Sequence, residues 1–168
     1  MRKARTNRLL LTTHIAVSVA VFGMELVLVA LGVAAARGVD PRQAYPAGHL
    51  MAQWLMAPLG LAALGTGLLL VLTTGWSPSR HWWVTVKLAV TAILTVLVFA
   101  ALIPGLTRMA DKAVTGTAIT SSEHLRFILI PAAGAAVLAL NIALGVIKPG
   151  GRARRALRTP VPENATAR

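Results

Sequence analysis

The sequence predicts an all-α fold, a four-helix transmembrane bundle with both termini in the cytoplasm. Four apolar runs cover residues 9–36, 48–74, 81–105 and 124–148. Each is long enough to cross a hydrocarbon core, which takes about 20 mostly apolar helical residues. Apolar residues make up 56% of the 168 and charged residues only 13%, whereas a soluble domain carries about 25% charged residues. Length and composition thus indicate an integral membrane protein independently of each other.

The basic residues predict the orientation. Twelve of the 17 Lys and Arg residues precede the first run, follow the fourth, or lie at the connection between the second and third. The other five lie near the remaining two connections. This bias matches the positive-inside rule and predicts a multi-pass protein of the plasma membrane. The net charge of +12 is therefore expected to orient the chain and contact anionic lipid headgroups, with no role in binding nucleic acid.

The first two spans are predicted as follows. Residues 1–8 form a basic cytoplasmic N-terminus. The run 9–36 exceeds the 7–15 apolar residues of a signal peptide, so it is expected to be retained as a span. Residues 37–47, which contain two prolines, are expected to form an outer loop. The second span, 48–74, carries Pro58, and the short turn 75–80 makes the second and third spans antiparallel neighbours.

The third span is expected to close at Pro104 and Gly105, before a polar outer loop over residues 107–123 that could include a partial surface helix. The fourth span is expected to stop at the Lys-Pro-Gly-Gly sequence of residues 148–151. Residues 149–168 are rich in Arg, Pro, Thr and Ala and are predicted to form a basic, disordered cytoplasmic tail. The spans form one domain, without a clear internal repeat.

Polar residues inside the spans are the candidate functional residues, because ionisable groups in a membrane are costly and usually face the bundle interior. His14, Lys87 and Asn141 each lie about 8–9 Å from the cytoplasmic end of their helices, at 1.5 Å per residue. They are predicted to form one layer in the inner leaflet, with Thr66 at a similar level.

A second, looser layer is predicted in the outer half, from Glu25, Gln53 and Thr95. Glu25 is a carboxylate far from either end of its span, so it is a candidate to bind a proton or a cation. Two alternatives stay open. The stripes of Gly, Ala and Thr are more simply helix-packing surfaces, and Lys87 could extend its long side chain to the interface instead of pairing with an anion.

The four histidines raise the possibility of haem b. His14 and His81 lie near the inner face, whereas His49 and His124 lie near the outer face. Two histidines therefore lie near each face, on alternate helices. Di-haem membrane cytochromes have this arrangement, with two imidazoles facing each other in each leaflet. Against it, three of the four lie at span ends and no spacing motif supports them.

No catalytic site or metal site is expected. The chain has no cysteine, which excludes disulfides and thiolate chemistry, and it shows no nucleophile–base pair, phosphate loop or metal-ligand spacing. The first hypothesis is therefore a non-enzymatic accessory protein or small transport component, working as a homodimer or with a membrane partner. The alternative is a haem b or quinone-linked electron carrier.

Three segments resemble a poorly characterised family of small four-helix membrane proteins, a domain of unknown function common in actinobacteria. The segments are residues 10–26, 57–91 and 145–151. The elements that carry the resemblance are His14, Pro58, Gly67, Arg80, His81, Trp83, Lys87, Lys148 and Pro149. Members often carry a histidine early in the fourth helix, where this chain has Ile130, with His124 six residues earlier. The resemblance implies the four-helix topology and no activity. Copper-resistance D-type membrane proteins offer a more distant analogy.

Overall fold

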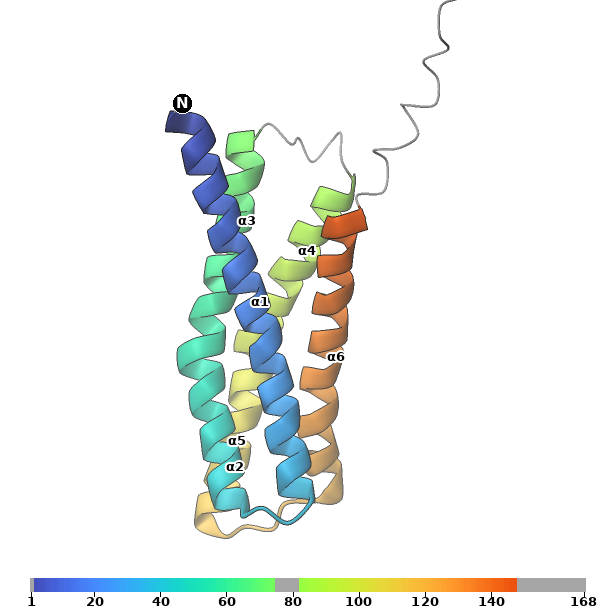
Figure 1. Cartoon of the computed structure of the whole chain (residues 1–168). Helices are drawn as coiled ribbons and strands as arrows, with labels where there is room; N and C mark the ends of the chain where they lie inside the picture. The colour runs from blue at the N-terminus through green and yellow to red at the C-terminus, as the bar shows by residue number, and fades with distance from the viewer. Residues whose placement is uncertain (1, 75–81, 148–168) are drawn as a thin grey trace, which may run out of the picture.

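The computed structural model describes residues 2–74 and 82–147, and within them the chain is entirely helical (Figure 1). The turn at residues 75–80, His81 and the tail 149–168 lie outside the described residues. The helices form four antiparallel rods, and the start of α1 lies at the same end as the end of α6 (Figure 1). We call this the terminal end of the bundle, and the other the loop end.

The first rod is α1, Arg2–Ala36, a continuous helix of 35 residues. It begins seven residues before the predicted span, so the basic N-terminal residues extend the helix. It ends at Gly38, whose φ of 101° is in the left-handed region that glycine adopts without strain.

The second rod consists of α2 (Pro41–Met51), the π-helical turn η1 (Ala52–Met56) and α3 (Ala57–Thr74). The sequence had predicted a loop as far as residue 47, but the helix begins at Pro41. Asp40 caps it, since its side chain accepts a hydrogen bond from the backbone N–H of Arg42 at 2.9 Å. Proline suits the first helical turn because its missing N–H has no partner there. A strong start signal therefore converts most of the predicted loop into helix.

The third rod consists of α4 (Trp82–Leu97), the π-helical turn η2 (Val98–Leu102) and α5 (Ile103–Thr115). The sequence had predicted closure at Pro104, yet the helix continues for about three more turns. Pro58 and Pro104 each follow a π turn by two residues. The wider turn, in which Ile103 N–H bonds Val98 C=O, accommodates a residue that cannot donate to the carbonyl four positions back. The predicted outer loop is thus mostly helix.

The fourth rod is α6, Ser121–Ile147. Gly116 ends α5 in the left-handed conformation, with φ 74°. Thr120 and Glu123 then form a capping box: Thr120 N–H donates to Glu123 Oε2 at 2.9 Å, and Glu123 N–H donates to Thr120 Oγ1 at 3.4 Å. The connection between the third and fourth rods is therefore short.

Each rod contains a helix long and apolar enough to cross a membrane, the candidate spans being Arg5–Ala36, Pro41–Thr73, Trp82–Thr115 and Ser121–Gly145. Large apolar side chains such as Leu72, Trp54 and Leu140 are about 70% exposed. An apolar outer surface of this kind is typical of a multi-pass membrane protein.

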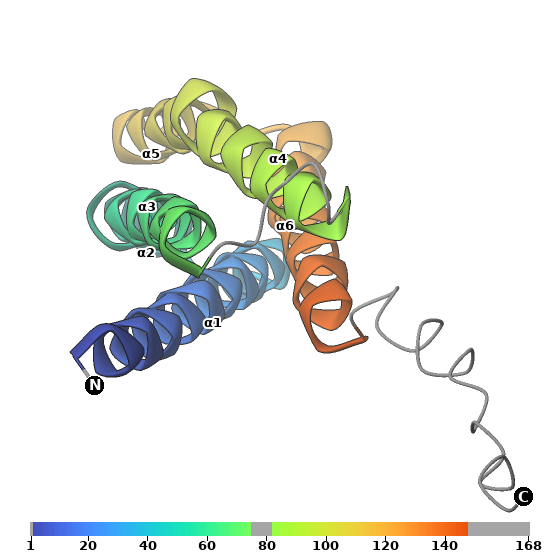
Figure 2. The ribbon, with the colours of Figure 1, turned by 90° about the horizontal axis from the view of Figure 1, so that it is seen from above.

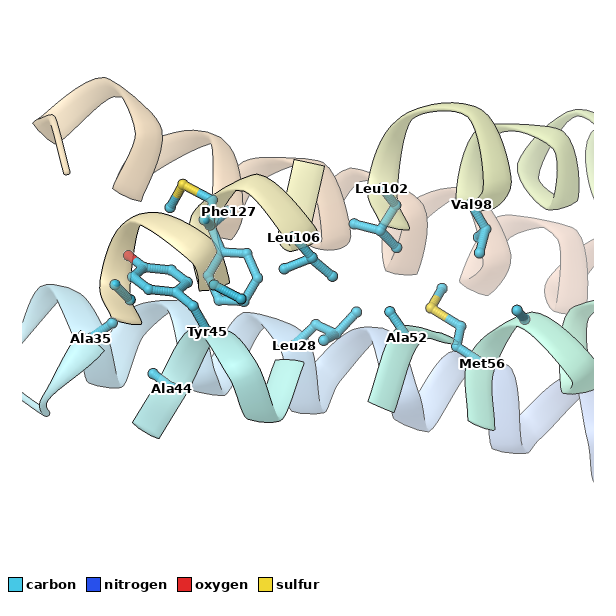
Figure 3. Close-up of a cluster of buried hydrophobic side chains, with 14 of the residues drawn as sticks. Leu28, Ala35, Ala44, Tyr45, Ala52, Met56, Val98, Leu102, Leu106 and Phe127 are labelled. Carbon is cyan, nitrogen blue, oxygen red and sulfur yellow. The ribbon is translucent and has the colours of Figure 1, made fainter. Parts of the chain in front are cut away.

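The loop-end half of the bundle is solidly packed. Tyr45 and Leu28 are fully buried, and the Tyr45 and Phe127 rings meet edge to face with centroids 5.0 Å apart (Figure 3). Gly48 allows this approach, because a Cβ there would lie 3.0 Å from the Phe127 ring. This apolar core extends along the bundle as far as Val21, Met56 and Val98.

Seen along the bundle, α1 lies between α3 and α6, with α4 across from it (Figure 2). The four rods therefore form a ring, in which α1 and α4 each pack against both α3 and α6.

Candidate functional site

A cavity of about 690 Å³ lies between the four rods in the terminal-end half of the bundle. Its volume falls within the roughly 300–1,000 Å³ of small-molecule sites. Its wall follows α1 from Asn7 to Glu25, which corresponds to about 27 Å of helix. Most of the wall is Leu, Val, Ile, Ala and Gly. The polar and charged side chains in it are Asn7, Arg8, His14, Ser18, Glu25, Lys87, Thr91, Thr95 and Asn141.

His14 is positioned by α3. Its Nδ1 lies 3.0 Å from Thr66 Oγ1, and that hydroxyl donates to the carbonyl of Ala62 at 2.6 Å. Because the hydroxyl hydrogen is used on the carbonyl, Thr66 accepts from Nδ1–H of His14. The imidazole lies against Gly67, where a Cβ would be 3.1 Å from Cε1. This arrangement leaves Nε2 of His14 as a hydrogen-bond acceptor.

Lys87 crosses from α4 to α6. A Cβ on Gly145 would lie only 2.5 Å from its Nζ, so the ammonium rests on the bare backbone of α6. Across residues 2–74 and 82–147 the only salt bridge joins Lys112 to Glu123, at the loop end. Lys87 therefore contributes a positive charge to the cavity wall, with no carboxylate beside it in that part of the chain.

Asn141 is only 8% exposed. Its Nδ2 donates to Thr91 Oγ1 at 3.3 Å, and Thr91 donates in turn to the carbonyl of Lys87 at 2.9 Å. The other amide atom, Oδ1, is buried and has no hydrogen-bond partner among the described residues. Buried polar atoms are nearly always paired, so this oxygen indicates a place for a donor from outside the chain.

Glu25 is 5% exposed, and its Oε2 is likewise buried without a partner among the residues described. Its carboxyl lies against Gly134, where a Cβ would come within 2.5 Å of Oε1. Nearby in the wall, Thr95 donates to the carbonyl of Thr91 at 2.8 Å and faces Gly60. Burying a carboxyl oxygen without a hydrogen-bond partner is costly. Glu25 Oε2 is thus the second buried oxygen of the cavity wall, after Asn141 Oδ1, that lacks a partner among the described residues.

Distances along α6 give the spacing of these groups. Gly134 marks the level of Glu25 and Gly145 the level of Lys87, and the eleven residues between them correspond to about 16 Å. Asn141 lies between them, about 6 Å from the Lys87 level. The cavity thus has a basic end, with Lys87 near the terminal end, and a carboxyl at its far end.

The two layers expected from the sequence share this one cavity. His14, Lys87 and Asn141 line it, as predicted for the inner layer, but Glu25 and Thr95 line it too. Gln53 does not, because its side chain is exposed on η1. In a π turn each residue advances by less than in an α-helix, so the predicted inward face is rotated at this position.

The remaining histidines lie elsewhere. His49 Nδ1 bonds Thr107 Oγ1 at 3.2 Å, and His124 Nδ1 bonds the hydroxyl of Tyr45. His124 lines a smaller pocket of about 280 Å³ at the loop end, and His49 does not. His81, the proposed partner of His14, lies outside the described residues. Within the described ranges, no three His, Asp or Glu side chains are grouped to share a metal ion.

Several contributors to the site lie on the stripes of Gly, Ala and Thr that the sequence predicted as helix-packing surfaces. Thr91 links two candidate residues, and Gly134 and Gly145 make room for the two charged side chains. The spacing did offer a signal, since Gly134, Asn141 and Gly145 recur at intervals of seven and four and share one face of a helix. At the loop end, Tyr45 and the Lys112–Glu123 pair, 2.5 Å apart, were not singled out from the sequence.

Comparison with protein-family models, curated proteins and solved structures finds no match to this chain. The cavity is therefore the feature of this chain that points to a function.

Proposed function

We propose that this protein is a non-enzymatic small transport component, or an accessory of one, that binds a solute in a cavity open toward the cytoplasm. The observation that carries the proposal is the contrast between the two halves of the bundle. One half is packed around Tyr45, Leu28 and Phe127, whereas the other encloses about 690 Å³ with polar groups in its wall.

The orientation follows from the placement of charge. Twelve of the 17 basic residues precede the first span, follow the fourth or lie near the connection between the second and third, so the positive-inside rule supports cytoplasmic termini in the plasma membrane. The cavity then faces the cytoplasm, and the packed half closes the outer side. Passage across the membrane needs a rearrangement of the rods, driven by the solute, by a second copy or by a membrane partner.

Each polar group has a role in this proposal. Lys87 supplies positive charge near the entrance, His14 supplies an acceptor at Nε2, and Asn141 supplies a hydrogen-bonding amide. Glu25, at the far end of the cavity, binds a proton or a cation. The unpaired oxygens of Asn141 and Glu25 support this reading, because a bound solute or ion would satisfy them.

Cysteine accessibility tests the proposal, and the natural chain contains no cysteine to interfere. Ser18 lines the cavity, whereas Ala16, two residues away on α1, is exposed on the outside of the bundle. A charged, membrane-impermeant thiol reagent is expected to label Ser18→Cys in inside-out vesicles and Ala16→Cys hardly at all, because a lipid-facing thiol does not ionise readily. Equal labelling of the two would contradict a water-accessible cavity.

The same vesicles test the orientation. Right-side-out vesicles are expected to show slow labelling of Ser18→Cys, at a rate that reports how often the outer half opens. Faster labelling from the outside than from the inside would reverse the proposed orientation.

His14 favours one alternative function. Its Nδ1–H is held by Thr66, which leaves Nε2 in the arrangement that histidine ligands of metals commonly adopt. A haem b or quinone-linked carrier would therefore use His14 first. An absorption spectrum of purified protein, oxidised and then reduced with dithionite, distinguishes the two: a Soret band that shifts on reduction supports the carrier, and a featureless spectrum from haem-supplemented cells rejects the haem form.

A further inference from the structure

We infer that the ligand of this cavity is an organic anion with an apolar body, held with its anionic group on Lys87 and with a hydrogen-bond donor directed at Glu25. This inference rests on the proposed function, since it names the solute class of the same cavity. It follows from three features: where the charges lie, which polar atoms lack a partner, and what the wall between them is made of.

The charges define the direction of the ligand. Lys87 Nζ rests on Gly145 without a carboxylate in contact, and Arg8 lies at the same end of the wall. The single acidic side chain of the wall, Glu25, lies about 16 Å further along α6. An ammonium in an apolar wall is stabilised by an anion beside it, so the anionic group of a ligand belongs at the Lys87 end.

The unpaired atoms define what else the ligand carries. Both are oxygens, Oδ1 of Asn141 and Oε2 of Glu25. The amide oxygen is only an acceptor, and it lies about 6 Å beyond the level of Lys87. Neither oxygen is accessible as the side chains stand, so a donor reaches them only when Asn141 and Glu25 turn toward the cavity. A ligand or a water molecule that then satisfies these atoms must offer hydroxyl or amine hydrogens. A purely hydrocarbon tail would leave both atoms unpaired.

The wall between these polar groups is apolar. Leu64, Val84, Leu88 and Leu94 contribute to it, and they would exclude a small hydrated ion or a compact sugar in favour of a chain or ring system. A polyanion such as a nucleotide fits poorly, because among the described residues Lys87 and Arg8 are the only Lys or Arg side chains of the wall, while Glu25 lies at its far end. A monoanionic amphiphile matches the charge, the wall and the length together.

Binding of radiolabelled dodecanoate and ω-hydroxydodecanoate to the protein in phosphatidylcholine nanodiscs tests the inference, with empty nanodiscs subtracted. Saturable binding of both is expected, about fivefold tighter for the hydroxylated acid because its hydroxyl donates to Glu25. Lys87→Gln should weaken both by about tenfold or more, since a charged hydrogen bond is lost. Glu25→Leu should abolish the preference for the hydroxylated acid.

Matched variants separate the site from general charge. Arg5 is an exposed cation at the same end of the bundle and is not part of the cavity wall, so Arg5→Gln should leave binding unchanged. Gly145→Ala keeps the charge but displaces the ammonium, because the new Cβ would lie 2.5 Å from Nζ. It should weaken binding by a few fold, and it tests the same contact if Lys87→Gln fails to fold.

The source of the anion is distinguished by adding phosphatidylglycerol to the nanodiscs. Competition with dodecanoate would identify a lipid of the bilayer as the occupant, and no competition would identify a free organic acid. The inference is overturned if neither acid binds saturably, if Lys87→Gln binds as well as Arg5→Gln, or if dodecyltrimethylammonium competes as well as dodecanoate.

The two proposals fail separately. If Ser18→Cys is labelled but neither acid binds, the water-accessible cavity stands and this ligand class is rejected. Acid binding without selective labelling of Ser18→Cys would place the acid elsewhere and reject the cytoplasmic cavity.

Discussion

Replacing Gly134 with alanine is the sharpest test of how Glu25 is placed. A Cβ at this position would lie 2.5 Å from Oε1 and 2.9 Å from Cδ of Glu25. Ordinary contact needs about 3.5 Å, so the carboxyl has to move by about 1 Å. Glu25 is 5% exposed, so the carboxyl can make this shift only by leaving its place against α6 and turning into the cavity that it lines. Overpacking of this kind costs about 1–3 kcal/mol.

The matched control is Gly65→Ala on α3, since a Cβ there would meet nothing within 4 Å. Both substitutions gain the same helix propensity, about 1 kcal/mol in favour of alanine, so their difference isolates the contact with Glu25. We expect Gly134→Ala to be less stable than Gly65→Ala by about 1–3 kcal/mol. The assay is unfolding by sodium dodecyl sulfate in mixed micelles, followed by circular dichroism.

A double substitution makes the test specific. Glu25→Ala removes the carboxyl, so Gly134→Ala in that background should cost no more than Gly65→Ala does. Equal stability of Gly134→Ala and Gly65→Ala in the natural background would refute the placement of Glu25 against α6. A cost that persists without the carboxyl would assign it to backbone packing instead.

Three further substitutions test the contacts that shape the bundle. Tyr45→Phe removes the hydroxyl that bonds His124 in the packed half and should cost about 1 kcal/mol, because a hydrogen bond to a half-buried partner is lost. The same change beside His124→Leu should cost less. Asp40→Ala removes the cap of α2 and should cost about 1 kcal/mol. Thr66→Val removes the acceptor of His14 and should cost about 1 kcal/mol. Mixed-micelle unfolding measures all three.

The same chain offers matched controls for Asp40→Ala and Thr66→Val. Asp111 is an exposed aspartate within α5 and does not cap it, so Asp111→Ala should be nearly neutral. Thr73 bonds the carbonyl of Leu69 just as Thr66 bonds that of Ala62, but no histidine among the described residues is bonded to it. If Thr73→Val were as costly as Thr66→Val, the contribution of His14 would be excluded.

The sequence predicted the four spans because the apolar runs are long, and it predicted His14, Lys87 and Asn141 as neighbours because depth along a helix follows from residue count. It also placed Gln53 in a looser outer layer with Glu25 and Thr95, whereas the Gln53 side chain is exposed and does not line the cavity. A projection at 3.6 residues per turn assumes an unbroken α-helix, and the π turn at Ala52–Met56 shifts the phase. The exposed side of η1 therefore carries Gln53, while Ala52 and Met56 are buried.

The helix ends and the cavity could not be predicted from the sequence for a related reason. Pro104 was expected to end a helix, but the preceding π turn absorbs its missing donor. The cavity depends on how far α4 stands from α1, and no property of a single helix specifies that distance. Helix phase predicts which side chains face inward, whereas the packing of neighbouring helices decides whether they meet across a core or across open space.

The glycines show how the two halves come to differ. Small residues in membrane helices usually serve close packing of the helices, and Gly32 and Gly48 do so against Phe127 in the packed half. In the hollow half four glycines instead face a polar side chain from a neighbouring rod. The pairs are His14 with Gly67, Glu25 with Gly134, Lys87 with Gly145 and Thr95 with Gly60. A Cβ on Gly67, Gly134 or Gly145 would come within 3.1 Å of its partner and displace it. These three glycines therefore keep His14, Glu25 and Lys87 in the cavity wall. The same residue type thus closes one half of the bundle and keeps the other available to a ligand.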